Sequence, residues 1–426
     1  MQKTIALTLL VMAGLSTGFA QTSASRLTGT VSDASGAHIE GATITVTNEK
    51  TGQARTATSN SEGLYVVPQL DPSVFSVKAV HAGFADASLN GLKLGVGQEV
   101  NQNITLQVGA VATSVTVDET LAHIDTSSAR IGVNISEREV AQLPLNGRQV
   151  SQLYLMAPGA VNSVSGTFDN IRFSGRSNQQ NAIRYDGVEG GSIVDASPGN
   201  LNGETTSNFR LQQSLENVQE FRVDSNNFPA EYGTGTGGQV SFVTKSGTNT
   251  LHGSAFEYIR NDAMDARNFF SGVRKDKLRL NQFGGSLGGA LQKDKLFVFG
   301  SYEGLRQRTV TPFVETTLSP LARSQAVAAV QPLLAAFPSG GIASSDPLLN
   351  IVTVNGPGFV DENSGGIRID YNKSDKYRFY ARYFRDEGVS SQTQNSTLSK
   401  YLQNVTPQNG VLNATQVLSS SLLNTR

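Results

Sequence analysis

The chain has 426 residues, 34 Lys and Arg against 35 Asp and Glu, and no Cys. This balance gives no support to nucleic-acid binding, which needs a basic stripe, and the lack of Cys excludes disulfides, thiolate metal sites and thiol catalysis. The four His residues show no H-E-x-x-H spacing, which argues against a zinc hydrolase. Because no apolar run after residue 20 approaches the ~20 residues of a membrane helix, any membrane insertion is expected to use β-strands.

The first 20 residues predict an export signal. Lys3 supplies a positive charge, Ile5–Leu15 is an apolar segment too short to span a bilayer, and Ala20 is a small residue at the expected cleavage point. A buried N-terminal helix is the alternative, but the abrupt change to polar Gln21–Ser23 disfavours it. We therefore expect residues 1–20 to be removed from a bacterial cell-envelope protein.

Residues 21–109 predict a small immunoglobulin-like β-sandwich. Short runs of alternating apolar and polar residues recur, separated by turn sequences such as Asp33–Gly36 and Ser59–Gly63, as in all-β domains. The expected strands are Arg26–Val31, Thr43–Asn48, Gln53–Thr58, Gly63–Val67, Phe75–His81, Leu92–Leu94 and Gln98–Leu106.

Residues 110–134 form a linker that contains one extended run, Thr113–Glu119. Its alternating valines, flanked by Thr and Ser, suit an edge strand. A last strand of the sandwich is an equally good interpretation, because any V-x-V run has this pattern. The run consists of Thr113, Ser114, Val115, Thr116, Val117, Asp118 and Glu119.

Residues 135–246 predict a mixed α+β domain. Ser136 with Glu139 forms a capping-box pattern that begins a short helix. A second helix is expected over Arg148–Ala157, and Pro158-Gly159 ends it. The other expected elements are strands at Ile171–Phe173 and Ala182–Tyr185, a Ser214-capped helix at about Leu215–Phe221, and a strand at Gln239–Lys245.

A glycine-rich segment precedes that last strand. Gly233–Gly238 fits the dinucleotide pattern G-x-G-x-x-G, but a strand follows it where that motif needs a helix. We interpret the glycines instead as a hinge that uses positive φ angles. The hinge residues are Gly233, Gly235, Gly237 and Gly238.

Residues 247–426 predict long antiparallel hairpins. Alternation, short turns on one side, long connections on the other and aromatic residues near strand ends are the pattern of an outer-membrane barrel. The expected strands are about His252–Arg260, Leu278–Leu291, Leu296–Gln307, Gly366–Tyr371, Tyr377–Asp386 and Val411–Leu418, with a helix at Leu321–Val330 in the long connection Thr309–Ser364. The aromatic residues are Phe297, Phe299, Tyr302, Tyr371, Tyr377, Phe379, Tyr380, Tyr383 and Phe384.

Several fixed blocks resemble TonB-dependent outer-membrane receptors. GTVSDASGAHIEGATITVTN resembles a carboxypeptidase-regulatory-like domain, and LPLNGR, NVQEFRV, NFPAEYG and GGQVSFVTKSGTNTLHG resemble the plug and its junction with the barrel in the Oar-like subgroup. The resemblance implies a mainly β chain with a signal peptide, a small Ig-like sandwich, a plug over residues 135–246 and a partial barrel over residues 247–426. Because a plugged transporter of this kind has about 22 strands, the six counted here lead us to expect the N-terminal portion of such a receptor, with an incomplete antiparallel barrel.

The resemblance also implies a function without covalent chemistry. Thr113–Glu119 resembles a TonB box, which would pair with a TonB-like periplasmic energy-transducing protein by strand addition. The expected surroundings are outer-membrane lipid and an extracellular ligand, a glycan or a peptide, with the sandwich in the periplasm. We expect no enzyme activity and no cofactor, metal or nucleic acid.

Two alternatives stay open at this point. Arg172, Arg176, Arg184 and Asp186 cluster in the polar part of the plug. They could contact ligand at the plug apex, but solvated charges or plug-to-wall salt bridges are the favoured interpretation. For the whole chain, the alternative is an envelope-anchored adhesion or carbohydrate-binding protein whose C-terminal strands serve only as an anchor.

Overall fold

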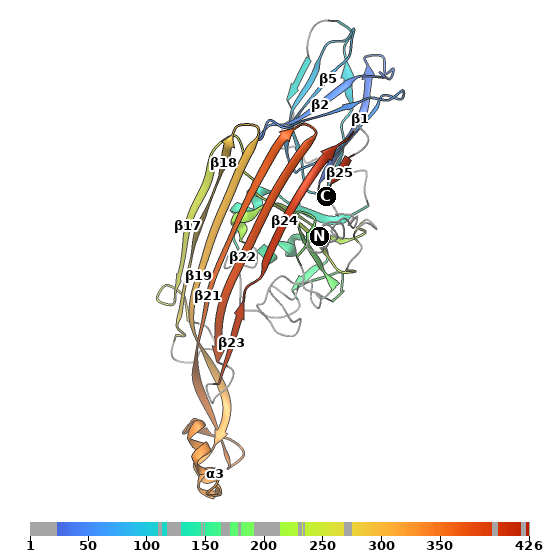
Figure 1. Cartoon of the computed structure of the whole chain (residues 1–426). Coiled ribbons are helices and arrows are strands. Elements are labelled where there is room, and N and C mark those ends of the chain that lie inside the picture. The colour runs from blue at the N-terminus through green and yellow to red at the C-terminus, as the bar shows by residue number, and fades with distance from the viewer. Residues whose placement is uncertain are drawn as a thin grey trace, which may run out of the picture.

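A computed structural model describes residues 24–109, 113–116, 129–145, 148, 150–162, 171–177, 180–190, 214–228, 232, 235–267, 275–393, 399–418 and 423–425. The predicted signal peptide, residues 1–20, lies outside the described residues. Three units follow one another along the chain: a sandwich, a plug and a long curved sheet, which we call the wall (Figure 1).

The sandwich consists of two sheets, as the alternating pattern predicts. One contains β4 (Leu64–Leu70), β1 (Ser25–Asp33), β7 (Glu99–Asn101) and β8 (Ile104–Leu106); the other has the order β3 (Ala54–Thr58), β2 (Thr43–Asn48), β5 (Ser73–Val80), β6 (Ala87–Leu94) and β9 (Thr113–Thr116). The expected strand Gln98–Leu106 is interrupted, because the side chain of Asn103 accepts the N–H of Thr30 at 3.0 Å in place of a backbone partner. Leu27, Val31, Ile44, Val46 and Phe75 belong to the shared core.

The plug is organised around one five-stranded sheet. Its order is β10 (Ile131–Ile135), β15 (Val218–Asn226), β16 (Gln239–Thr244), β13 (Ala182–Tyr185) and β14 (Val188–Glu189), and β11 (Ala160–Asn162) pairs separately with β12 (Ile171–Phe173). The capping box of Ser136 and Glu139 begins α2 (Glu137–Gln142), as predicted. The rings of Tyr154, Tyr185, Phe221 and Phe242 pack together in its core.

Of two helix predictions in the plug, one holds with a different helix type and the other is wrong. The segment expected as a helix over Arg148–Ala157 is a 3-10 helix, η2 (Val150–Met156). The helix expected at Leu215–Phe221 is only a 3-10 turn, η5 (Leu215–Asn217), followed by β15. Hydrogen-bonded strands on both sides, β10 and β16, hold this segment extended, and its β-branched and aromatic residues suit that position.

The wall is an antiparallel sheet that curves past the plug. Its order is β17 (His252–Asn261), β18 (Leu278–Gln292), β19 (Leu296–Leu318), β21 (Leu349–Ser374), β22 (Tyr377–Thr393), β24 (Gln408–Val417) and β25 (Leu423–Thr425), while β20 (Ile342–Ala343) pairs with β21 and β23 (Lys400–Val405) with β22. These described strands do not close into a barrel, as expected, but they number nine rather than six.

Half of the long connection expected over Thr309–Ser364 is strand. β19 has 23 residues and β21 has 26, so the two extend together well beyond their neighbours. α3 (Pro320–Gln325) and η6 (Gln331–Ala336) lie at the far tip (Figure 1). Among the described residues, no helix is long and apolar enough to cross a membrane.

The two faces of the wall differ in chemistry. Ile367, Ile369, Tyr371, Phe379 and Tyr383 are exposed on the face that points away from the plug. An outward apolar surface of this kind is what lipid requires. Phe297 and Phe299 lie near the start of β19, as predicted, but they are 1% and 2% exposed, so they face inward and not toward lipid.

Candidate functional site: the plug-to-wall contacts

The plug and the wall do not share an apolar core. Among the described residues, the buried apolar side chains form separate clusters in the sandwich, in the plug and, with three members, in the wall. The described contacts between plug and wall are mainly hydrogen bonds and ion pairs, gathered in two clusters. A polar contact can exchange its partners for water at small net cost, whereas separating apolar surfaces cannot.

The first group, the Arg148 cluster, joins the plug to β17, β18 and β19. The Arg148 guanidinium donates to Glu216 at 2.8 Å and to Glu303 of β19 at 3.2 Å. It also lies 4.0 Å from the ring centroid of Phe256. Ser214 donates to Glu303, and Ser254 and Ser286 both donate to Glu216.

Arg148 and Glu216 each stabilise the charged form of the other. Burial lowers the pKa of Arg148, but the charges of Glu303 and Glu216 outweigh it and leave the pKa raised. Burial raises the pKa of Glu216, but hydrogen bonding from Ser254 and the charges of Lys245 and Arg148 outweigh it, so the pKa lies below its ordinary value. Both shifts favour the charged forms of Arg148 and Glu216, so this pair is ionised at neutral pH.

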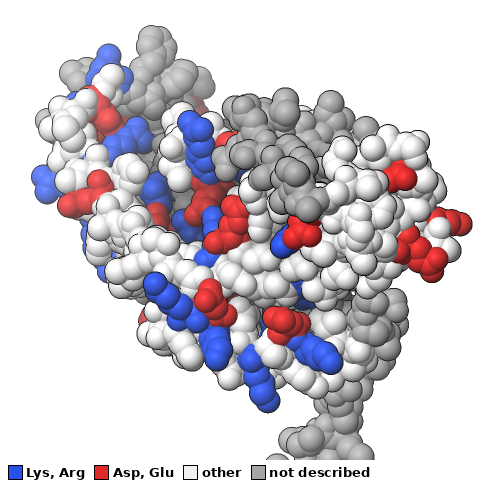
Figure 2. Space-filling view, turned by 90° about the horizontal axis from the view of Figure 1, so that it is seen from above, with Lys and Arg blue, Asp and Glu red and all other residues white. Residues whose placement is uncertain are grey.

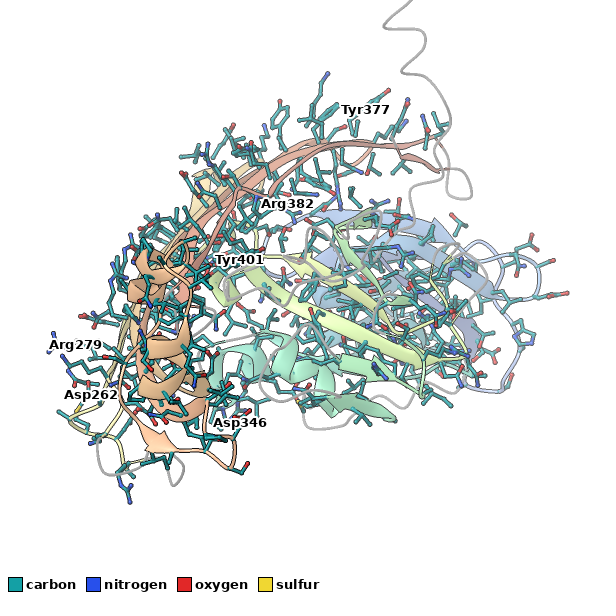
Figure 3. All side chains as sticks on the ribbon, turned by 90° about the horizontal axis from the view of Figure 1, so that it is seen from below. Asp262, Arg279, Asp346, Tyr377, Arg382 and Tyr401 are labelled. Carbon is teal, nitrogen blue, oxygen red and sulfur yellow. The ribbon has the colours of Figure 1, made fainter. Side chains whose placement is uncertain are left out.

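The second group, the Asp186 cluster, joins the plug to β21 and β22. The Asp186 carboxylate lies 2.7 Å from Arg382 Nε and 3.5 Å from Arg368 Nη1, and it accepts two hydrogen bonds from Thr244 at 2.9 Å. Arg368 is further held by Asp370. Figure 3 shows Arg382 on the side of the wall that faces the plug. Asp186 has a φ of 52°, in the left-handed region that Asp tolerates better than most residues.

The predicted ligand-contact residues do not form one exposed group. Asp186 is committed to the wall, and Arg184, 3% exposed, donates to Gln239 at 2.5 Å and lies near the ring of Tyr232. Arg172 is exposed on β12, and half-buried Arg176 donates to the carbonyl of Thr236. This arrangement fits the salt-bridge alternative for Asp186, and only Arg172 faces solvent freely.

The glycine-rich segment is closely packed. Gly235 has the positive φ that the hinge interpretation expects, at 76°. At Gly238 an added Cβ would lie 2.3 Å from the ring of Phe173, and at Gly237 it would lie 2.5 Å from Asn181 Oδ1. These two glycines therefore permit close approach rather than a special φ. Gly233 lies outside the described residues.

The predicted TonB-box run begins as a strand of the sandwich. Thr113, Ser114, Val115 and Thr116 form β9, which pairs in parallel with β6 at the edge of the five-stranded sheet. Val117, Asp118 and Glu119 lie outside the described residues. The geometry therefore makes Thr113–Thr116 an edge strand of the sandwich, which is one of the two interpretations that the pattern allows.

Polar contacts also join the sandwich to the plug. The Glu220 carboxylate accepts the backbone N–H of Val96, and Gln219 Nε2 donates to the carbonyl of Pro72 at 2.8 Å. Arg130 donates to the carbonyl of Gly97 at 2.7 Å. Seen from above, charges of both signs are interspersed over this part of the molecule, without a large patch of one sign (Figure 2). The described residues contain no group of three metal-ligating side chains.

Sequence reasoning missed the wall side of both clusters. Glu303, Arg368 and Arg382 occupy inward positions in strands whose outward positions are aromatic or aliphatic. Buried charge alternating with exposed aromatic residues, as in Ile367–Tyr371, is the feature that could have indicated them. Arg148 and Asn217 lie in the blocks LPLNGR and NVQEFRV, although the pattern assigned them no partner.

Two parts of the chain match the models of known domain families. Residues 26–107 match the carboxypeptidase regulatory-like domain, and residues 243–329 and 319–426 match the outer membrane beta barrel domain. The TonB-dependent transporter Oar of Myxococcus xanthus is 26% identical over 315 residues, which cover 68% of this chain and 28% of that protein. The chain is similar to part of a TonB-dependent transporter and spans about a quarter of its length.

Two solved receptor structures are also similar to parts of the chain. The ferric-catecholate import receptor Fiu from E. coli is 14% identical with a TM-score of 0.36, covering 70% of this chain and 48% of the receptor. The ferric enterobactin receptor PfeA from Pseudomonas aeruginosa is 16% identical with a TM-score of 0.42, covering 69% of this chain and 40% of the receptor.

Proposed function

We propose that the chain supplies the sandwich, the plug and part of the wall of a TonB-dependent outer-membrane receptor. The receptor binds an extracellular ligand and couples its uptake to an inner-membrane energy transducer. The polar plug-to-wall contact is the main support. Buried ion pairs fix the plug in one position, whereas separate apolar cores allow plug and wall to part as folded units.

Ligand binding would act on the plug position. A ligand shifts the plug only if it binds the docked and displaced positions with different affinities. Exposed Arg172 is the polar plug residue that this proposal offers to ligand, since Arg184 and Asp186 are occupied in the docked position.

Energy coupling in this proposal uses β9. The strand pairs with β6 on one side and has no partner on its other side among the described strands. A strand of a TonB-like protein could add there through backbone hydrogen bonds, the mode called β-augmentation. Pulling on β9 would then act on the linker between the sandwich and the plug.

The test replaces Val115 within β9. Val115→Pro removes a backbone donor and should abolish binding to a purified TonB C-terminal domain, whereas Val115→Ala keeps the donor and should bind like the unchanged chain. Surface plasmon resonance measures the affinity, and circular dichroism checks that the sandwich stays folded. Unchanged affinity of a folded Val115→Pro chain would reject β9 as the coupling strand.

A further inference from the structure

A polar cavity of about 550 Å³ lies where the sandwich, the plug and the wall meet. This volume lies within the range of small-molecule sites, about 300–1,000 Å³. Sandwich residues of the β2–β3 hairpin line one side, and Lys245 of the plug and Arg368 and Arg378 of the wall line the others. In Figure 1 the β2 end of the sandwich sits beside the turns that join the wall strands.

Three residues of the β2–β3 hairpin that line this cavity each carry a buried donor atom without a described acceptor. Arg55 Nε, Gln53 Nε2 and Thr51 Oγ1 have no hydrogen-bond partner among the described residues. Arg55 is only 8% exposed, so bulk water does not solvate its guanidinium well. A buried charge without a partner is costly, and burial lowers the pKa of Arg55 to about 10, which still leaves it cationic at neutral pH.

The acids around the cavity are already engaged. Arg378 donates to Asp71 and, at 2.8 Å, to Gln53 Oε1. Asp186 and Asp370 both pair with Arg368. Arg55 forms no ion pair within 4 Å among the described residues, and neither does Lys245 on the plug side of the cavity. Glu137 pairs with Lys50, and Glu49 accepts the N–H of Gly91, so the described lining groups without an ion pair are the cations Arg55 and Lys245 and the carboxylate of Glu49.

We propose that this cavity binds a small oxyanion, a carboxylate or a phosphate, through Arg55. A guanidinium presents two parallel N–H groups that match either anion, and the hydroxyl of Thr51 and the amide of Gln53 supply further donors from the same hairpin. Because residues of all three units line the cavity, a bound anion links the sandwich to the plug and the wall. The site is independent of the extracellular ligand and of β9.

In the experiment, the full chain, purified in detergent, is titrated with inorganic phosphate and, separately, with succinate. Isothermal titration calorimetry measures the binding. Chloride at equal ionic strength is the control for screening. We expect saturable binding of at least one probe. Arg55→Met should weaken it at least tenfold and Thr51→Val about two- to fivefold, because each removes a donor and roughly keeps the volume. Arg26→Met, which changes an exposed arginine of the same sandwich, should leave the affinity within twofold.

A second measurement covers the case in which Arg55→Met fails to fold. The affinity of Thr51→Val for the probes then tests the site. In addition, a bound probe should protect the unchanged chain against trypsin at the joint between sandwich and plug. Preference for phosphate over succinate identifies the anion class. The proposal is overturned if neither probe binds the unchanged chain, or if folded Arg55→Met binds as tightly as the unchanged chain, since solvent alone would then fill the cavity.

Discussion

The carboxyl group of Glu220 makes the joint between sandwich and plug sensitive to pH. Burial raises its pKa from 4.5 to about 7, although the N–H of Val96 and the charges of Lys93 and Lys50 act the other way. Folding therefore favours the protonated form. Glu220 therefore contributes about 3 kcal/mol to the free energy of unfolding below pH 4.5, and this contribution is lost as pH rises to about 7.

Glu220→Gln should remove this dependence. We expect the variant to be more stable than the unchanged chain at pH 8 and equal to it at pH 4, in thermal unfolding of the chain in detergent. Glu216→Gln is the matched contrast, because the pKa of Glu216 is lowered and its carboxylate stabilises the docked plug above about pH 4.5. A Glu220→Gln chain that unfolds with the same pH profile as the unchanged chain would contradict the assignment.

Arg148 is the residue on which the first plug-to-wall cluster depends. Arg148→Met should destabilise the docked plug by about 3–5 kcal/mol, because it leaves the buried carboxylates of Glu216 and Glu303 without their cation. Adding Glu303→Gln should restore part of this loss, since one of the two unpaired charges disappears. Urea titration of the four chains of this double-mutant cycle gives the coupling energy, and strictly additive effects would show that the pair does not interact.

At the scale of the element, alternation and turn chemistry predicted most strands well. Thr43–Asn48, Ile171–Phe173 and Ala182–Tyr185 match the predicted bounds residue for residue. The failures have a common cause in tertiary context: Leu215–Phe221 becomes mostly strand because neighbours bond it on both sides, and the two long strands β19 and β21 support each other far beyond the bilayer length. Local patterns do not contain such partners.

The candidate site shows the same limit more sharply. Arg148 lies in a block that the sequence made conspicuous, but its partner Glu303 is 155 residues further along the chain. The sequence marks Asp186 as a charged plug residue but does not identify its partner, because the contact with Arg368 spans 182 residues. One sequence without its relatives specifies the residue types of these pairs but not which side chains meet.

The glycine-rich segment before β16 provides a prediction about packing. Gly238→Ala should destabilise the plug by about 1–3 kcal/mol, because the added methyl group would overlap the buried ring of Phe173. Gly300→Ala is the control, since its nearest neighbour would be the carbonyl of Gly366 at 3.8 Å. Chemical denaturation measures both, and equal stability of the two variants would show that the segment has room to move.

At the scale of the whole molecule, three folded units meet through polar contacts. The apolar cores of sandwich and plug are separate, and many of the apolar side chains of the wall, such as Ile367, Ile369 and Tyr383, are exposed rather than packed on the plug. Cooperative unfolding of the chain as one unit requires strong apolar interfaces, which the described contacts between units do not supply. We therefore expect plug and wall to lose their structure at different urea concentrations.

A disulfide between plug and wall tests this expectation. The chain has no Cys, so Asn217→Cys with Ser301→Cys introduces a single pair at a position where the two native side chains touch. In the reduced form, trypsin should cleave the plug at a lower urea concentration than it cleaves the wall, because urea readily replaces the hydrogen bonds between them. After oxidation the plug cannot leave, so the two protection curves should move together. The Ser301→Cys single variant controls for the substitution, and identical curves for reduced and oxidised chains would show that plug and wall already unfold as one body.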